Sequence, residues 1–131
     1  MKLAEHSRNR LLNTFAQWSV PKDFADPMYN YLVHGFEPGS CFTAVLANDF
    51  AGAIRRSHPA NTIEAFKALS GWIDDTVPST ARGSYPAVTA WIRMLPEKRR
   101  AILEREHLVF TEEDEMMLVL SGARTYEPIL Y

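Results

Sequence analysis

Apolar side chains recur at helical spacing along most of this chain, and the pattern starts near its beginning. The first group is spaced three or four residues apart, at Leu11, Leu12, Phe15 and Trp18. This spacing predicts an amphipathic helix over Leu3–Trp18. The Val20-Pro21 step ends it, because the residue before a proline disfavours helical angles.

A second helix is predicted between Asp26 and Gly35. Asp26 is suited to cap it, Pro27 to its first position, and Gly35 to its C-terminal end. In an equally fair alternative, this helix begins near Lys22 and is kinked at Pro27.

Two further helices are predicted on either side of the Ser57-His-Pro stop. Ser40 is expected to cap a helix over Cys41–Arg56. After the stop, Asn61 and Glu64 form a capping-box-like pair that opens another helix. One side of that helix would carry Ile63, Phe66, Leu69 and Ile73.

The remainder of the chain predicts a loop over Val77–Gly83 and then short helices. Ser84 caps one that includes Val88, Trp91 and Ile92, and Pro96 begins another that runs to about Glu106. Thr111 is expected to cap a last helix over Glu112–Leu120, although Met116–Leu120 also fits a buried strand. The expected fold is therefore a compact, all-α single domain over residues 1–131, with five to seven short helices and at most a minor C-terminal strand.

Composition narrows the class of protein. The 131 residues, 47% of them hydrophobic, suit one globular domain. Fourteen Lys and Arg against sixteen Asp and Glu give a net charge of −2, which makes no bulk electrostatic case for nucleic acid or an anionic membrane. One cysteine excludes an internal disulfide framework. With no signal-peptide pattern and no apolar run of membrane length, a cytoplasmic protein is expected.

The run Tyr31-Leu-Val-His-Gly35, followed by Pro38-Gly39 and Phe42-Thr-Ala-Val-Leu-Ala-Asn-Asp49, resembles a family of small uncharacterised proteins of tailed bacteriophages and prophages. The likeness covers about residues 21–92, which leaves a helix over 1–20 and an extension over 93–131 outside it. It implies a phage-encoded accessory protein in the bacterial host cytoplasm, and it implies no activity.

Asp49 is the candidate structural acid. On one continuous helix it would fall within the apolar stripe of Phe42, Val45, Leu46 and Phe50. Because an unpartnered buried carboxylate is costly, we expect Asp49 to accept N–H bonds at another helix's N-terminus or to pair with an arginine such as Arg82. A catalytic or ligand-binding acid, and plain exposure, are the alternatives. Asn61 is the second polar residue expected to be buried.

Catalytic and metal chemistry find little support. Cys41 at a helix N-terminus could be a nucleophile with His34 or His58 as base, but its neighbours favour a small core cysteine. The four histidines lack paired ligand spacing, and the glycines form no phosphate-binding loop. We therefore expect no catalytic residues, no cofactor and no metal.

The expected function is binding of a host protein, with a defence or gene-expression machine as the expected setting. The alternatives are a nucleic-acid regulator that uses Arg93–Arg105, where five cations and the acids Glu97, Glu104 and neighbouring Glu106 leave about +2, and a small hydrolase or transferase. Nucleic acid and membrane are the less favoured partners, and a homo-oligomer stays open. The tail over 123–131 would pack on the domain or on a partner. The candidate contact residues are Phe36, Glu37, Arg93, Arg99, Arg100, Tyr126 and Tyr131.

Overall fold

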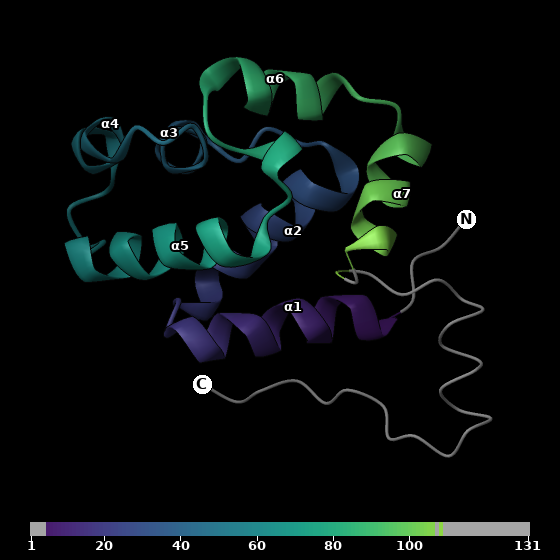
Figure 1. Ribbon diagram of the computed structural model, residues 1–131. Helices are drawn as coiled ribbons and strands as arrows, with labels where there is room; N and C mark the ends of the chain where they lie inside the picture. Colours follow the sequence, from purple (N-terminus) through teal and green to yellow (C-terminus); the bar gives the residue numbers. More distant parts are fainter. Residues whose placement is uncertain (1–4, 107, 109–131) are drawn as a thin grey trace.

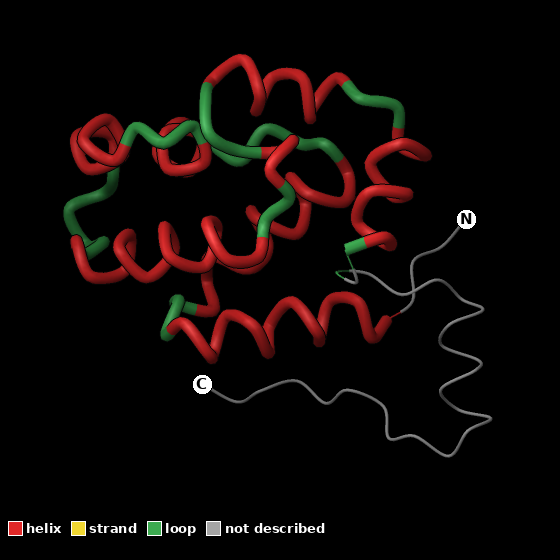
Figure 2. The backbone as a smooth tube through the Cα atoms, viewed as in Figure 1, coloured by secondary structure: helices red, strands yellow, loops and turns green. Residues whose placement is uncertain are grey.

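The computed structural model describes residues 5–106 and residue 108. Within this part the chain is helical and contains no strand (Figures 1 and 2). The elements are α1 (Glu5–Trp18), η1 (Lys22–Phe24), α2 (Ala25–His34), α3 (Ser40–Leu46), α4 (Phe50–Arg56), α5 (Ile63–Thr76), η2 (Ser79–Ala81), α6 (Tyr85–Arg93) and α7 (Pro96–Arg105). The predicted all-α single domain is confirmed.

The central element is α5. It packs against α1 on one side and against α3 and α4 on the other. Figure 1 shows α1 and α5 running across the view while α3 and α4 are seen end-on, so the two pairs cross at a steep angle. Helix α6 contacts α2 and α3, and α7 contacts α2. Helix α2 therefore contacts both α6 and α7.

Large aromatic side chains from four helices build the core. Five of them are wholly buried: Phe15, Tyr31, Phe66, Trp72 and Trp91. Phe15 meets Trp72 edge to face, with ring centroids 4.6 Å apart. The Trp72 Nε1–H donates to Thr14 Oγ1 at 2.9 Å, which satisfies the polar end of the indole.

Most of the predicted apolar faces are confirmed. Leu11 and Phe15 are buried on α1, and Phe66, Leu69 and Ile73 on α5. Ile63 was expected on the same face of α5, but its side chain is 60% exposed because α5 begins at this residue.

The single helix predicted over Cys41–Arg56 is wrong, because the chain ends α3 at Leu46 and starts α4 at Phe50. Asn48 adopts left-handed angles (φ +65°). The N–H of Asp49 then donates to Ala44 O at 2.8 Å and that of Asn48 to Val45 O at 3.1 Å. These two bonds form a Schellman motif with asparagine at the left-handed position. Three residues thus redirect an apolar stripe that looks continuous in the sequence.

The predicted start of α2 is displaced. The 3-10 turn η1 runs directly into α2, so the helix begins at Ala25 rather than being capped by Asp26. Pro27 falls in the first turn, where N–H groups have no helical acceptor, and the helix accommodates it. The alternative start near Lys22 is closer to the structure.

Two other predicted caps lie one residue away from the observed ones. Gly39, not Ser40, precedes α3. Thr62, not Asn61, caps α5, and its hydroxyl accepts from the Ala65 N–H at 3.1 Å. Asn61 is also only partly buried, which corrects the expectation of a buried polar residue.

Other predicted boundaries agree with the structure. Ser84 caps α6 by accepting from the Ala87 N–H at 3.2 Å, and α7 begins at Pro96. The loop over Val77–Gly83 contains the turn η2. The alternatives for Glu112–Leu120 and the tail lie outside the described residues. None of the described helices combines the length and apolar character needed to cross a bilayer.

Candidate functional site

Arg99 on α7 is a buried cation. Only 3% of the residue is exposed, although it stands among basic residues in the sequence. Its Nη1 contacts the backbone oxygens of Met94, Trp91 and Ile92, the last two at 3.4 Å. These carbonyls lie at the C-terminal end of α6, where a positive charge is favoured by the helix dipole. Burial lowers the pKa of Arg99, with Glu97 acting in the opposite sense.

Trp91 closes the end of α2 in a similar way. Its Nε1–H donates to the Tyr31 and Leu32 carbonyls, each at 3.2 Å. The Tyr31 hydroxyl donates in turn to Ala81 O at 2.6 Å, and burial raises the pKa of that phenol above its ordinary value. Side chains of α6 and α7 thus donate to carbonyls at the C-terminal ends of α2 and α6, where helix geometry supplies few N–H partners. Tyr31 O and Trp91 O also accept the backbone N–H groups of Gly35 and Met94.

Gly35 completes this arrangement. It ends α2 in a left-handed conformation (φ +68°), and a Cβ placed there would lie 2.7 Å from Arg99 Cζ. The guanidinium of Arg99 therefore touches the turn after α2 and the turn after α6 at once.

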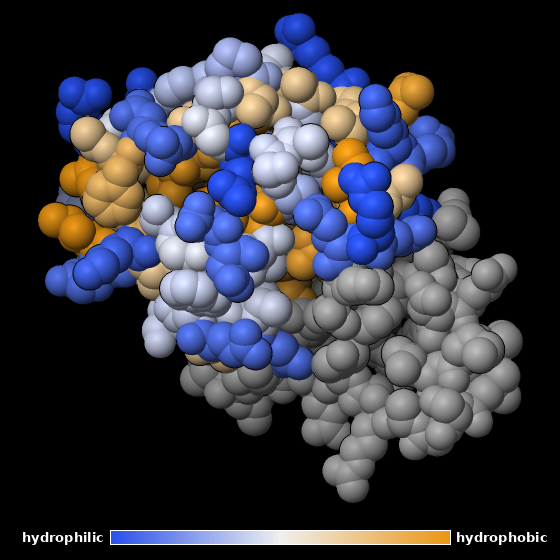
Figure 3. All heavy atoms as spheres, in the orientation of Figure 1, coloured by the Kyte–Doolittle hydropathy of each residue, from blue (hydrophilic) through white to orange (hydrophobic). Residues whose placement is uncertain are grey.

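Two large hydrophobic side chains are exposed directly beyond these turns. Phe36 follows Gly35 and is 60% exposed, and Leu95 follows Met94 and is 69% exposed. Glu37 is exposed beside Phe36. We call Phe36, Glu37 and Leu95 the two-turn surface. Figure 3 shows hydrophobic atoms at the α6–α7 connection surrounded by hydrophilic ones.

The two-turn surface overlaps only partly with the predicted contact residues. Phe36, Glu37 and Arg93 are exposed as expected. Arg99 is not available as a contact residue, because it is buried. Arg100 is partly buried, and its Nε lies 3.4 Å from Glu104 Oε1. Leu95 was missed, although an apolar residue directly before a helix-opening proline is a visible signal.

A pocket of about 320 Å³ adjoins this surface on the α2 side. Its walls are Asp26, Pro27, Asn30, Phe36, Glu37 and Pro38. The His34 ring lies near the rings of Tyr29 and Phe36, with centroid distances of 5.9 and 5.6 Å. Phe36 is therefore held at its base while most of the side chain faces solvent.

Asp49 occupies a different place from the one predicted. It caps α4, accepting the Gly52 N–H at 3.0 Å on Oδ1 and the Tyr85 O–H at 2.7 Å on Oδ2. Arg56 Nη1 donates to the same Tyr85 oxygen at 2.9 Å. These bonds, that from Tyr85 first, lower the pKa of Asp49.

Asp49 does bind a helix N-terminus, but the expectation that it would be another helix's is wrong, because Asp49 caps α4, the helix that it opens. Deep burial and a pair with Arg82 are wrong: Asp49 is partly exposed, and Arg82 Nη1 lies 3.4 Å from Asp74 Oδ1. Tyr85 was missed as the partner, since residues 36 positions apart show no sequence signal.

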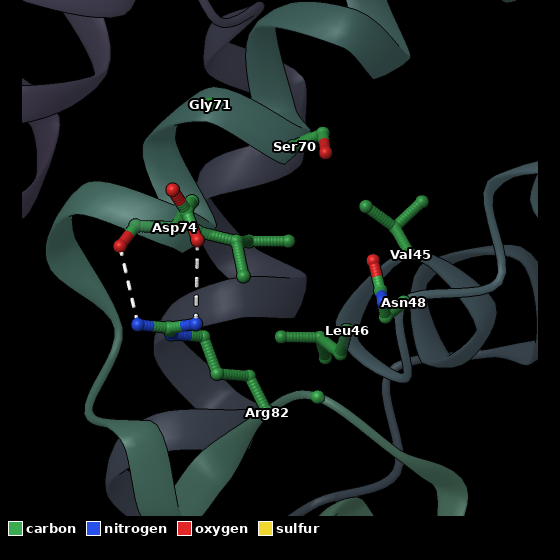
Figure 4. Close-up of a pocket in the computed structure, with 9 residues that line it drawn as sticks. Val45, Leu46, Asn48, Ser70, Gly71, Asp74 and Arg82 are labelled. Atoms are coloured by element: carbon green, nitrogen blue, oxygen red, sulfur yellow. Dashed lines mark hydrogen bonds and ion pairs between the residues drawn. The ribbon is translucent and has the colours of Figure 1, made fainter.

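A second pocket, of about 390 Å³, lies between α5 and the turn joining α3 to α4 (Figure 4). Ser70 and Asn48 stand on its opposite walls, and the Asp74–Arg82 pair on its rim. Arg82 Nε also donates to Val77 O at 2.9 Å and Nη2 to Asp74 O at 3.2 Å. The guanidinium of Arg82 is thus bound to the Val77 and Asp74 carbonyls and to the Asp74 carboxylate.

The candidate catalytic groups have separate surroundings. His58 Nδ1 accepts from the Ala60 N–H at 3.0 Å, and His34 contacts the two aromatic rings named above. Cys41 is a partly buried free cysteine that packs against the core. No group of three metal-ligating side chains occurs among residues 5–106 and 108.

Comparisons of the chain with protein-family models, with curated proteins and with solved structures found no match.

Proposed function

We propose that this protein is a non-enzymatic accessory protein of a tailed bacteriophage that binds a host protein in the bacterial cytoplasm. Its contact region would be the two-turn surface. The resemblance of the Tyr31–Asp49 stretch to small phage proteins supports the context, and a defence or gene-expression machine is the expected setting.

One observation carries the proposal. Phe36 and Leu95 are exposed, yet the residues just before them contact the same buried guanidinium. Because the backbone of these turns is already fixed, little backbone conformational entropy is lost when a partner covers the exposed side chains. Aromatic side chains such as Phe36 are enriched at protein–protein interfaces.

The nucleic-acid alternative has weaker support. Of the five cations in the basic segment, Arg99 is buried and Arg100 has an acidic neighbour, which leaves Arg93, Lys98 and Arg105 exposed. Affinity for a phosphate backbone grows with the number of contacts, and about three give little binding at physiological salt. The hydrolase alternative would need Asp49, which is already bound to Tyr85 and Gly52.

The test is affinity capture of the tagged protein from a phage-infected bacterial lysate, followed by mass spectrometry. Wild type is compared with the double variant Phe36→Ala, Leu95→Ala. Ile63→Ala is the matched control, because Ile63 is 60% exposed and is the first residue of α5, a helix separate from both turns.

We expect wild type and the Ile63 variant to retain one stoichiometric protein that the double variant loses. Capture of that protein by the double variant would refute the proposal that the two-turn surface is the contact region. If wild type retains no stoichiometric protein, the binding function itself is refuted.

A further inference from the structure

The pocket beside Phe36 combines an aromatic face with carboxylates. Phe36 is among its lining residues, Glu37 and Asp26 supply two acids, and Asn30 is a further polar residue. All six of the lining residues come from α2 or the segment that follows it, so the pocket is one local structure.

The charges of this pocket are not balanced from within. Asp26 already has an interaction of its own, so the inference rests on Glu37. Glu37 is exposed and forms no hydrogen bond or ion pair in the described part of the chain. No lysine or arginine lines the pocket. A carboxylate next to an exposed aromatic face attracts a cation, through charge on one side and the ring quadrupole on the other.

We propose that this pocket receives an arginine side chain of the partner protein, an inference that rests on the proposed function. A guanidinium is planar, so it stacks on the face of Phe36 while its N–H groups donate to Glu37 and the Asn30 amide oxygen. A lysine ammonium is a compact, strongly hydrated charge and gains less from the ring. The pocket of about 320 Å³ has room for the guanidinium and part of its stem.

The experiment needs no knowledge of the partner. Nα-acetyl-arginine methylamide is titrated into the full ¹⁵N-labelled protein, and the backbone amide shifts are followed by NMR. Nα-acetyl-citrulline methylamide is the matched probe, since it has nearly the same shape and no charge. We expect saturable shifts at Asn30, Phe36 and Glu37 with the arginine probe. The apparent affinity for the citrulline probe should be weaker by a factor of about five or more.

Three variants sharpen the result. Glu37→Gln keeps the size and removes the charge, and Phe36→Leu keeps an apolar group and removes the ring; each should weaken arginine binding about fivefold. Glu64→Gln, at an exposed acid outside the pocket, should leave binding unchanged. Equal shifts with both probes, or unaltered binding by Glu37→Gln, would overturn the inference.

The same variants separate this inference from the proposed function. If partner capture is lost in the Phe36→Ala, Leu95→Ala protein but kept by both Glu37→Gln and Phe36→Leu, the function stands and the arginine inference fails. If wild type captures no partner but still binds the arginine probe at these residues, the proposed binding of a host protein is refuted and arginine binding by the pocket is supported.

Discussion

Gly35 and Arg99 fit together so closely that a Cβ on the glycine would lie 2.7 Å from the arginine Cζ. The contact joins the end of α2 to α7 across 64 positions of the chain. It fixes the turn that carries Phe36, so the stability of the fold and the shape of the two-turn surface depend on the same pair.

The first prediction concerns the coupling of this pair. Gly35→Ala should destabilise the protein both through the left-handed angle and through the contact with the guanidinium. Arg99→Met keeps an apolar stem and removes that group. In a double-mutant cycle by urea unfolding, the double variant should be at least about 1 kcal/mol more stable than the sum of the single changes. Strict additivity would show that the guanidinium does not restrict position 35.

The second prediction is that Arg99 stabilises the folded protein. Arg99→Met removes the donors to the α6 carbonyls and should lower the free energy of unfolding by about 2 to 4 kcal/mol. Arg93→Gln is the control, and because Arg93 is exposed its effect should stay within about 0.5 kcal/mol. Similar values for the two variants would contradict the buried role.

The third prediction is a pH dependence through Asp49. Its pKa is lowered in the folded state, so the stability it contributes is complete above the unfolded value of about 3.9 and is lost as the pH falls through the lower folded value. Asparagine keeps the cap, so Asp49→Asn isolates the charge. The gap in melting temperature between wild type and Asp49→Asn should be constant near pH 6 and shrink below about pH 4.

Asp49→Ala removes the cap as well and should melt several degrees lower than Asp49→Asn at neutral pH. Asp74→Ala serves as the control, since it removes only an exposed ion pair with Arg82. A gap that widens in acid would contradict the lowered pKa.

The fourth prediction is a change of sign at Gly52. A Cβ there would come 2.2 Å from Asp49 Oδ2, so Gly52→Ala should destabilise wild type by displacing the cap. In an Asp49→Ala background that obstacle is gone. The same change should then stabilise by up to about 1 kcal/mol, because alanine is the better helix former. Thermal unfolding of the four proteins tests this, and destabilisation in both backgrounds would refute it.

Most helices were predictable because their apolar faces have a clear period, as with Phe66, Leu69 and Ile73 on α5. The break after Leu46 did not follow from the apolar pattern, because the stripe continues through it. The dipeptide Asn48-Asp49 did contain the signal: asparagine tolerates left-handed angles, and aspartate caps the next helix.

The candidate site was harder to predict. Phe36 and Glu37 were found because they stand in a turn flanked by Gly35 and Pro38. Arg99 was assigned to the surface because its neighbours are charged, and only the tertiary structure places α6 carbonyls around it. A side chain that binds backbone oxygens of another helix has no partner whose identity the sequence could reveal.

Trp91 of α6 closes the end of α2, and Arg99 of α7 closes the end of α6, which separates two tasks that small proteins often combine. Trp91 and Arg99 hold the turns from inside, whereas Phe36 and Leu95 contribute little to the core. Side chains at positions 36 and 95 are thus free to be exchanged for others without loss of the fold. The domain is a suitable scaffold for directed libraries, in which new binding specificities would be selected at the rim of an unchanged framework.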